Sequence, residues 1–321
     1  MSHGTPLDVL TLSAGDVARL IDPKAAIDAL AKGFEALSRG EVQVPPRPMV
    51  ESAGKGFAIA MLASAPGQNI ALKLVSVFGD NARLGLPSHH AVINLLSPET
   101  GQPVATMDGG VITAVRTAAA SMVTVRALAR PEARIATVIG GGVQGRSHVE
   151  LLSHVRDFAE IRVASRRRES AEAIAAGIAR TVVTTDIEGA VRASDVICLC
   201  SSSDRPVIEA SWVKSGTHIT SVGFVAKGGE LPPALIDRAR LFVESKAAFS
   251  PPPVGASELA GLDPARGAEI GEMLLGLKCG RQSADEITIY KSMGNAMEDL
   301  VLANLVYAAA KERGIGRIVA L

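Results

Sequence analysis

Hydrophobic and polar positions follow different periods along the chain, and each period predicts a different kind of element. Residues 13–40 have helical spacing, with Asp22 as a predicted N-cap, Pro23 at the first helical position and Gly40 as a stop signal. Residues 42–107 instead form short apolar runs bounded by Gly, Pro, Asn and Asp, which predicts a β-meander. The first part of the chain is therefore predicted to be rich in strands.

From about Val111 the pattern changes again. A long Ala-rich segment predicts a helix, and short apolar runs then alternate with amphipathic segments. Strands that alternate with helices indicate a parallel sheet with helical crossovers. Residues 290–314 repeat their apolar positions at helical spacing, which predicts a long amphipathic helix near the end of the chain.

Composition narrows the class of protein. The 321 residues exceed one typical domain, so two domains are expected. Lys plus Arg and Asp plus Glu are both 33, which gives a formal net charge of zero. The chain has no basic stripe and no zinc-ligand spacing, so neither a nucleic-acid partner nor a bound metal is expected.

The cysteines and the N-terminal residues bear on the compartment. Cys198, Cys200 and Cys279 are odd in number and not spaced as metal ligands, so we interpret them as reduced core residues in a cytoplasmic protein. The N-terminus lacks a basic n-region, and we find no apolar stretch of about 18 residues. Neither a signal peptide nor a membrane span is therefore expected.

A glycine-rich turn is the first candidate site. In "ATVIGGGVQGRSHVE", Gly140, Gly142 and Gly145 have the G-x-G-x-x-G spacing between an apolar strand and a helix. The first glycine suits the tight turn, the second admits a pyrophosphate, and the third allows close packing of helix and strand. The turn therefore predicts a dinucleotide site rather than an ordinary strand-to-helix turn.

The end of the next strand bears on which dinucleotide is bound. An NAD site usually has an acidic residue there for the ribose 2′-hydroxyl. This chain has "RVASRRRES", with Ser165 in the acidic residue's place and Arg166 and Arg167 after it. A hydroxyl and guanidinium groups suit a 2′-phosphate, so we expect NADPH, with NADH as the alternative.

Lys73 interrupts an apolar strand, "IALKLVSV". Burying an unpaired ammonium costs several kcal/mol, so a reason for its presence is needed. Strand alternation puts Lys73 on the same face as Ala71, Val75 and Val77. If that face lines a cleft, a bound carboxylate would compensate the charge, and burial would lower the pKa of Lys73. Otherwise Lys73 would extend to solvent from an edge strand.

These and other segments together resemble one family. "KLVSVFGDN", "GLPSHHAVINLLSPETGQPVATMDG", "RTAAAS", "VIGGGVQG", "ITSVG" and "YKSMGNAMEDL" are similar, in order, to the ornithine cyclodeaminase/mu-crystallin family. The resemblance implies an α/β subunit with a Rossmann-like dinucleotide domain at 116–299. It implies a discontinuous α+β domain, 1–115 with 300–321, for substrate binding and for homodimer formation.

The resemblance also implies roles for particular residues. Lys73 corresponds to the active-site lysine, Arg47 and Arg116 to arginines that bind the substrate carboxylate, and Met61 to the substrate pocket. The expected cofactor contacts are Ser88, His89, Thr117, Gly140, Gly141, Gly142, Val143, Gln144, Gly145, Ser165, Arg166, Arg167, Val222 and Ser292.

One departure from the family pattern affects the predicted reaction. The cyclodeaminases have an aspartate that relays protons shortly before a Glu-Leu pair. Here Gly223 and the Glu230-Leu231 pair fit, but Phe224 and Val225 take the place of the acid, and neither can transfer a proton.

We therefore expect reduction of a cyclic imino acid, Δ1-pyrroline-2-carboxylate or Δ1-piperideine-2-carboxylate, to L-proline or L-pipecolate. The alternatives are an open-chain amino-acid dehydrogenase or ketimine reductase, an ornithine cyclodeaminase that recruits another acid such as Glu230, and a mu-crystallin-like binding protein. Either role for Lys73, anchor of the carboxylate or proton donor, agrees with the sequence.

Overall fold

The computed structural model describes residues 7–320, and the chain divides into two compact units. Unit 1 contains the residues up to Arg116 and those from Asn295 onward, and unit 2 is Thr117–Gly294. The first border lies one residue from the sequence-based border at 115/116. The second differs, because the border at 299/300 would cut through a helix that begins directly after Asn295.

Unit 1 is built on a seven-stranded mixed sheet with the strand order β15-β1-β6-β5-β4-β3-β2. The strands β2 to β6 pair antiparallel in chain order, which confirms the predicted meander, and β1 pairs parallel with β6. Their bounds are β1 Asp8–Leu12, β2 Met49–Ser52, β3 Gly56–Ala63, β4 Ile70–Val77, β5 His89–Leu96, β6 Pro103–Asp108 and β15 Arg317–Ala320.

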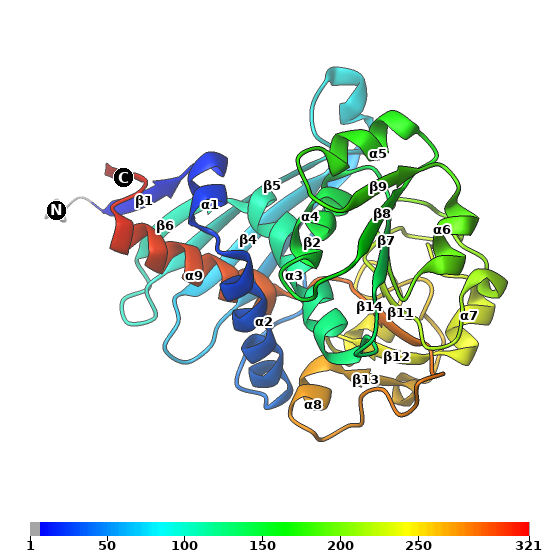
Figure 1. The fold of residues 1–321 in the computed structure, drawn as a ribbon. Coiled ribbons are helices and arrows are strands. Elements are labelled where there is room, and N and C mark those ends of the chain that lie inside the picture. The colour runs from blue at the N-terminus through cyan, green and yellow to red at the C-terminus, as the bar shows by residue number, and fades with distance from the viewer. Residues whose placement is uncertain (1–6, 321) are drawn as a thin grey trace, which may run out of the picture. The chain divides into compact units, whose positions relative to one another are not determined.

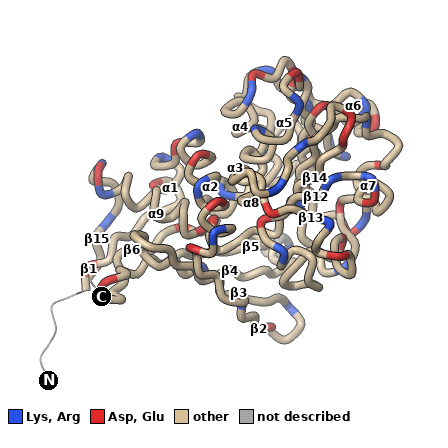
Figure 2. The backbone as a smooth tube through the Cα atoms, turned by 90° about the horizontal axis from the view of Figure 1, so that it is seen from below, with Lys and Arg blue, Asp and Glu red and all other residues tan. Residues whose placement is uncertain are grey.

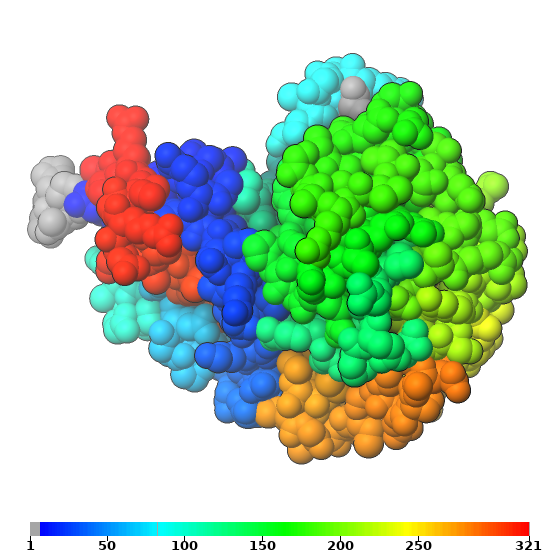
Figure 3. Space-filling model, viewed as in Figure 1, coloured from blue at the N-terminus to red at the C-terminus, as the bar shows by residue number. Residues whose placement is uncertain are grey.

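Three helices pack in unit 1: α1 (Ala14–Leu20), α2 (Pro23–Ser38) and α9 (Ala296–Arg313). The side chain of Asp22 caps α2, as predicted, and Asn295 caps α9 in a capping box with Glu298. The helix α9 contacts β3, β4 and β5 and also α1 and α2 (Figure 1), and Figure 3 shows it in red against the blue N-terminal helices. One face of the meander is thereby buried.

Unit 2 is a Rossmann-like domain. Its eight-stranded sheet has the order β13-β12-β14-β11-β10-β7-β8-β9, and every pair is parallel. The order β9-β8-β7-β10-β11 is the 3-2-1-4-5 order of doubly wound dinucleotide-binding folds. The strands are β7 Ile135–Ile139, β8 Glu160–Ala164, β9 Thr181–Thr184, β10 Val196–Leu199, β11 His218–Ser221, β12 Arg240–Val243, β13 Gly267–Glu269 and β14 Thr288–Lys291.

The strands of unit 2 are connected by α4 (Val143–Leu152), α5 (Arg168–Ala175), α6 (Ile187–Ala193), α7 (Pro233–Arg238) and α8 (Ile270–Leu274). The helix α3 (Gly109–Leu128) runs from the last residues of unit 1 into unit 2. Short 3₁₀ helices lie at Gly79–Leu84, Ala210–Trp212, Lys246–Phe249 and Pro264–Arg266. In both units basic and acidic residues are interspersed along the backbone (Figure 2), as the zero net charge suggests.

Two expectations need correction. Tyr290 and Lys291 belong to the buried strand β14, not to the final helix, and Cys279 is exposed rather than in the core. The helix α3 has a window with mean hydropathy 1.3, long and apolar enough to span a membrane, although 72% of that window is buried inside the structure. The expected absence of a signal peptide rests partly on residues 1–6, which lie outside the described residues.

Candidate active site

Lys73 lies at the centre of a buried row across the sheet of unit 1. It is directly opposite Met61 on β3 and Ile93 on β5, and Ile93 is opposite Met107 on β6. The side chains of this row are all buried, and that of Lys73 is only 1% exposed. The alternation of β4 therefore points Lys73 inward, and the structure excludes the edge-strand alternative.

The charge of Lys73 is compensated by the protein itself. The Nζ of Lys73 lies 2.8 Å from Oδ2 of Asp299 and donates to Oδ1 at 2.9 Å, and Asp299 is likewise 1% exposed. Thr113 on α3 accepts a further hydrogen bond from Nζ at 3.4 Å. Asp299 lies in the first turn of α9, so a carboxylate of the chain itself, which the sequence analysis did not identify, already balances Lys73.

Arg116 extends the same buried cluster. Its Nη1 donates to Oε2 of Glu298 at 2.8 Å, and its Nε lies 3.3 Å from Oδ1 of Asp299. Glu298 is fully buried and also accepts from the backbone N–H of Asn295, which fixes it at the start of α9. Lys73, Arg116, Glu298 and Asp299 thus form a cluster with equal numbers of positive and negative groups.

Burial and charge both act on Lys73. Desolvation, with a smaller effect of Arg116, lowers the pKa of Lys73 to about 8, although Asp299 and Glu298 oppose the shift. The direction agrees with the sequence-based expectation. An ammonium with this pKa can release a proton close to neutral pH.

The other predicted residues of unit 1 lie on loops and strand ends. Arg47 is partly buried and directly precedes Pro48, whose carbonyl accepts from the N–H of Ala60 on β3. Ser88 and His89 lie where β5 begins, and the Ser88 hydroxyl is 2.9 Å from Nδ1 of His89. Desolvation, then the neighbouring His90, lowers the pKa of His89.

The glycine turn of unit 2 has the geometry that a dinucleotide needs. A Cβ on Gly140 would meet the carbonyl of Cys200, and one on Gly145 would meet the carbonyl of Gly140. A Cβ on Gly141 would meet Ser170, whereas one on Gly142 would meet nothing within 4 Å. The turn is thus tightly packed on the protein side and open at Gly142, as pyrophosphate binding requires.

The first turn of α4 agrees with an anion site. Gly142 is its N-cap, without a side-chain cap and with no acidic residue in the first turn, so its backbone N–H groups suit a phosphate. Val143 is 70% exposed, and the buried Oε1 of Gln144 has no hydrogen-bond partner among the described residues. Thr117 on α3 is nearly buried, and its carbonyl accepts from the hydroxyl of Ser121.

Ser165, Arg166 and Arg167 directly follow β8. Ser165 is partly buried and accepts from the backbone N–H of Arg167, while both arginines are exposed. Among the described residues neither guanidinium forms an ion pair, in contrast to Arg168, which pairs with Glu172 at 2.9 Å. The two arginines are therefore available to an anion at this strand end.

Val222 and Ser292 follow β11 and β14, which are adjacent in the sheet. The N–H of Val222 donates to the carbonyl of Leu199, and that of Ser292 donates to the carbonyl of Ser221. The hydroxyl of Ser292 donates to the buried carboxylate of Glu244. Both residues thus lie at the carboxyl edge of the sheet, the edge at which open α/β folds bind ligands.

Glu230 is unsuited to replace the missing acid of the cyclodeaminases. Its carboxylate is fully buried and accepts from the N–H groups of Ser201 and Gly223 and from the hydroxyl of Ser221. A carboxylate held by three donors is a structural acceptor. Glu230 is therefore not suited to be the acid that an ornithine cyclodeaminase would recruit. Phe224, in the loop after β11, is 40% exposed.

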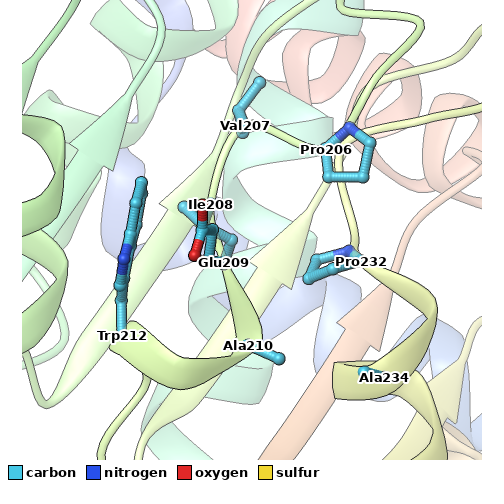
Figure 4. A pocket seen from close by; sticks show the side chains of 8 residues that line it. All are labelled: Pro206, Val207, Ile208, Glu209, Ala210, Trp212, Pro232 and Ala234. Carbon is cyan, nitrogen blue, oxygen red and sulfur yellow. The ribbon is translucent and has the colours of Figure 1, made fainter.

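A further hollow of unit 2, of about 430 Å³, is distinct from these residues (Figure 4). It lies between the segment from Pro206 to Trp212 and Pro232, the residue that precedes α7, with Glu209 on one wall. None of the predicted site residues lines it.

Sequence reasoning missed Asp299 and Glu298. The signal was present as the consecutive acids of "NAMEDL" directly after a helix cap. Two acids on one turn of an amphipathic helix are usually solvated, and only the packing of α9 on β4 shows them to be buried.

Comparisons with known proteins agree over nearly the whole chain. The model of the ornithine cyclodeaminase/mu-crystallin family matches residues 8–314. Ketimine reductase mu-crystallin of Mus musculus is 36% identical over 293 residues, 90% of this chain and 91% of the relative.

Two solved structures are also similar. The Δ1-pyrroline-2-carboxylate reductase of Thermococcus litoralis, in complex with NADH and L-proline, has a TM-score of 0.91 at 33% identity and covers 97% of this chain and 100% of its own. An archaeal alanine dehydrogenase dimer with bound NAD has a TM-score of 0.87 at 32% identity. It covers 98% of this chain and 99% of its own.

The parallel sheet with its glycine turn, together with the buried lysine–carboxylate cluster, defines a dinucleotide-dependent oxidoreductase. The chain belongs to the ornithine cyclodeaminase/mu-crystallin family. It is an NAD(P)-dependent enzyme that acts on imine or amine bonds.

Proposed function

We propose that this enzyme reduces a small cyclic imino acid, Δ1-pyrroline-2-carboxylate or Δ1-piperideine-2-carboxylate, to L-proline or L-pipecolate. The observation that carries the proposal is the buried Lys73–Asp299 pair beside Met61, which offers a proton within an apolar row. The similarity to a Δ1-pyrroline-2-carboxylate reductase over 97% of the chain supports it.

Lys73 acts as the proton donor in this proposal. The ion pair with Asp299 holds the ammonium of Lys73 in place, and its pKa near 8 suits proton transfer. A reduced dinucleotide, when bound, would supply the hydride for C2. Lys73 donates the proton that the ring nitrogen needs, so the C=N double bond becomes a C–N single bond with one new N–H bond and one new C–H bond.

The arginines serve the carboxylate of the substrate. Arg116 is held rigidly by Glu298 and Asp299, and Arg47 lies on the loop beside the strand that carries Met61. A guanidinium presents parallel N–H donors that match a carboxylate. Met61 gives the ring an apolar neighbour next to Lys73.

For the coenzyme we propose NADPH. The geometry of Gly140, Gly142 and Gly145 fits a pyrophosphate, and the open N-terminus of α4 adds backbone donors. Ser165 followed by Arg166 and Arg167 favours a 2′-phosphate over a free ribose hydroxyl. NADH remains the alternative, because the similar solved structures carry NADH or NAD.

A homodimer is the proposed assembly. The outer face of the meander exposes large apolar side chains on three adjacent strands. Leu62 on β3 is 40% exposed, Leu74 on β4 is 47% exposed and Val92 on β5 is 38% exposed. An apolar sheet face of this kind is typical of a surface covered by another protein. The archaeal alanine dehydrogenase is likewise a dimer.

A substrate screen tests the function. Consumption of NADPH and NADH is followed with Δ1-pyrroline-2-carboxylate, Δ1-piperideine-2-carboxylate, pyruvate plus ammonia, and pyruvate plus alkylamines, and ammonia release from ornithine is measured in parallel. We expect rapid NADPH oxidation with a cyclic imine and no ammonia from ornithine. Faster turnover with pyruvate plus ammonia would identify an open-chain dehydrogenase and overturn the proposal, and tight coenzyme binding without turnover of any imine would favour a binding protein.

A further inference from the structure

A second buried ionic cluster lies in unit 2, at the carboxyl edge of its sheet. Lys291, the last residue of β14, is 1% exposed, and its Nζ lies 2.8 Å from Oε2 of Glu258. The same Nζ donates to the hydroxyl of Ser221 at 3.1 Å and to the carbonyl of Gly223 at 2.7 Å. Lys291 therefore joins β14 to the end of β11.

Glu230 closes the cluster from the other side. Its Oε2 accepts from the N–H of Gly223 at 2.7 Å and from the hydroxyl of Ser221 at 3.0 Å, and its Oε1 accepts from the N–H of Ser201 at 2.5 Å. Side chains thus hold both the N–H and the C=O of Gly223. The backbone on either side of Val222 is fixed although it lies beyond the end of the strand.

This cluster adjoins the glycine turn. Ser201 directly follows Cys200, and a Cβ on Gly140 would meet the carbonyl of Cys200. The strands β7, β10, β11 and β14 are neighbours in the sheet, so their carboxyl ends share one edge. In doubly wound folds the dinucleotide extends along this edge from the glycine turn. Because the adenosine half would lie toward the end of β8, the nicotinamide half would meet the ends of β10 and β11.

The charges of the cluster do not cancel. Every hydrogen-bond partner of the Glu230 carboxylate is a donor, because the single proton of Ser221 goes to Glu230 while its oxygen accepts from Lys291. Of the two carboxylates, Glu258 pairs with the ammonium of Lys291 and Glu230 reaches it only through Ser221, which leaves one negative charge in excess. The nicotinamide ring is cationic when oxidised and neutral when reduced.

We propose that Glu230, Lys291 and Glu258 fix the segment 221–223 as the docking surface for the nicotinamide half of the coenzyme, and that their excess negative charge favours the oxidised ring. These are positioning residues, because they act through the backbone around Val222. The inference rests on dinucleotide binding and not on the proposed imino acid. The inference would therefore hold for a different substrate as well.

Binding measurements on the full chain test it. Dissociation constants are determined by fluorescence or calorimetry for NADP⁺, NADPH and 2′,5′-ADP, a probe for the adenosine half, with NAD⁺, NADH and 5′-AMP as the parallel set. Glu230→Gln removes the charge and keeps one acceptor oxygen, so one of the two backbone N–H groups that the carboxylate accepts from loses its acceptor. We expect its Kd for the oxidised coenzyme to rise about tenfold, the Kd for the reduced coenzyme to rise less, and the Kd of the adenosine probe to stay within about twofold.

A matched variant separates charge from geometry. Ser221→Ala removes the bridging hydroxyl and no charge, so it should weaken oxidised and reduced coenzyme by the same factor and again spare the adenosine probe. Thermal unfolding reports whether each variant is folded. A parallel loss of affinity for the adenosine probe would show a general structural role and overturn the inference. Unchanged affinities for all ligands in both variants would overturn it as well.

Discussion

Replacing Asp299 by asparagine tests the central claim that Lys73 is the titrating proton donor. Asp299→Asn keeps the shape of the side chain and one acceptor oxygen, but it removes the carboxylate that lies 2.8 Å from Nζ of Lys73. Asp299 is the largest influence that opposes the desolvation of Lys73, and Arg116 continues to repel the ammonium. The pKa of Lys73 should therefore fall below its value of about 8.

The size of the shift follows from Coulomb's law. At the 2.8 Å that separates Nζ from Oδ2, two unit charges interact by roughly 6 kcal/mol at an effective dielectric constant of about 20. Since one pKa unit corresponds to about 1.4 kcal/mol, roughly 4 units is the upper bound, and we expect a decrease of at least about 1 unit. In Asp299→Asn the amide oxygen still accepts a hydrogen bond from Nζ of Lys73. Because this bond continues to stabilise the ammonium, we expect a pKa shift closer to 1 unit than to the upper bound.

The assay is the pH dependence of kcat for imine reduction. The ammonium of Lys73 is the required acid, so kcat is full below its pKa and declines as the pH rises through it. In the unaltered enzyme this decline is expected near pH 8, and in Asp299→Asn it should begin at least about one pH unit lower. A decline at unchanged pH in a folded variant would refute the assignment of Lys73.

Stability needs a control, because breaking a buried ion pair costs about 3–5 kcal/mol. Asp195→Asn is a matched variant in unit 2. Asp195 is also nearly buried and accepts from the N–H groups of Arg134 and Ile135, but it has no contact with Lys73 among the described residues. It should lower the melting temperature and leave the pH profile of kcat unchanged.

Three further predictions follow from the described geometry. Lys73→Ala should lower kcat by about 10²–10⁴-fold while the Kd for coenzyme, measured by fluorescence, changes little; comparable losses in both would show that Lys73 is structural. Replacing Arg166 and Arg167 together by serine should raise the Kd for NADPH and spare that for NADH, and equal effects would contradict a 2′-phosphate site. Gly142→Ala should keep the melting temperature, because its Cβ meets nothing within 4 Å, yet weaken coenzyme binding; Gly145→Ala should lower the melting temperature, because its Cβ would meet the carbonyl of Gly140. Normal coenzyme affinity in Gly142→Ala would place the pyrophosphate elsewhere.

Much of the fold could be predicted because local signals agreed with it. The alternation in residues 42–107 and their turn residues predict the meander, and the glycine spacing falls between β7 and α4 as expected. The strand β14 was missed for a physical reason. Its four residues are all buried, so they have no period of their own, and they merge with the pattern of the helix that follows.

The candidate site could be predicted only in part. The oddity of a lysine in an apolar strand is local, and its burial and lowered pKa were expected. Its partner was not, because Asp299 is 226 positions away in sequence and no local pattern joins the two. Glu230 was seen as a spare acid, but its role depends on donors from three different loops and strand ends, which only the folded sheet brings together.

The sequence distance between Lys73 and Asp299 has a consequence for synthesis. At about 5–20 residues per second, a ribosome needs roughly 10–45 seconds to travel the 226 positions that separate them. During that interval Asp299 is not yet available to pair with Lys73. Chains interrupted before residue 299 would contain the whole dinucleotide-binding unit but lack the acid that pairs with Lys73. The proposed catalytic centre therefore cannot be complete before residue 299 has been synthesised.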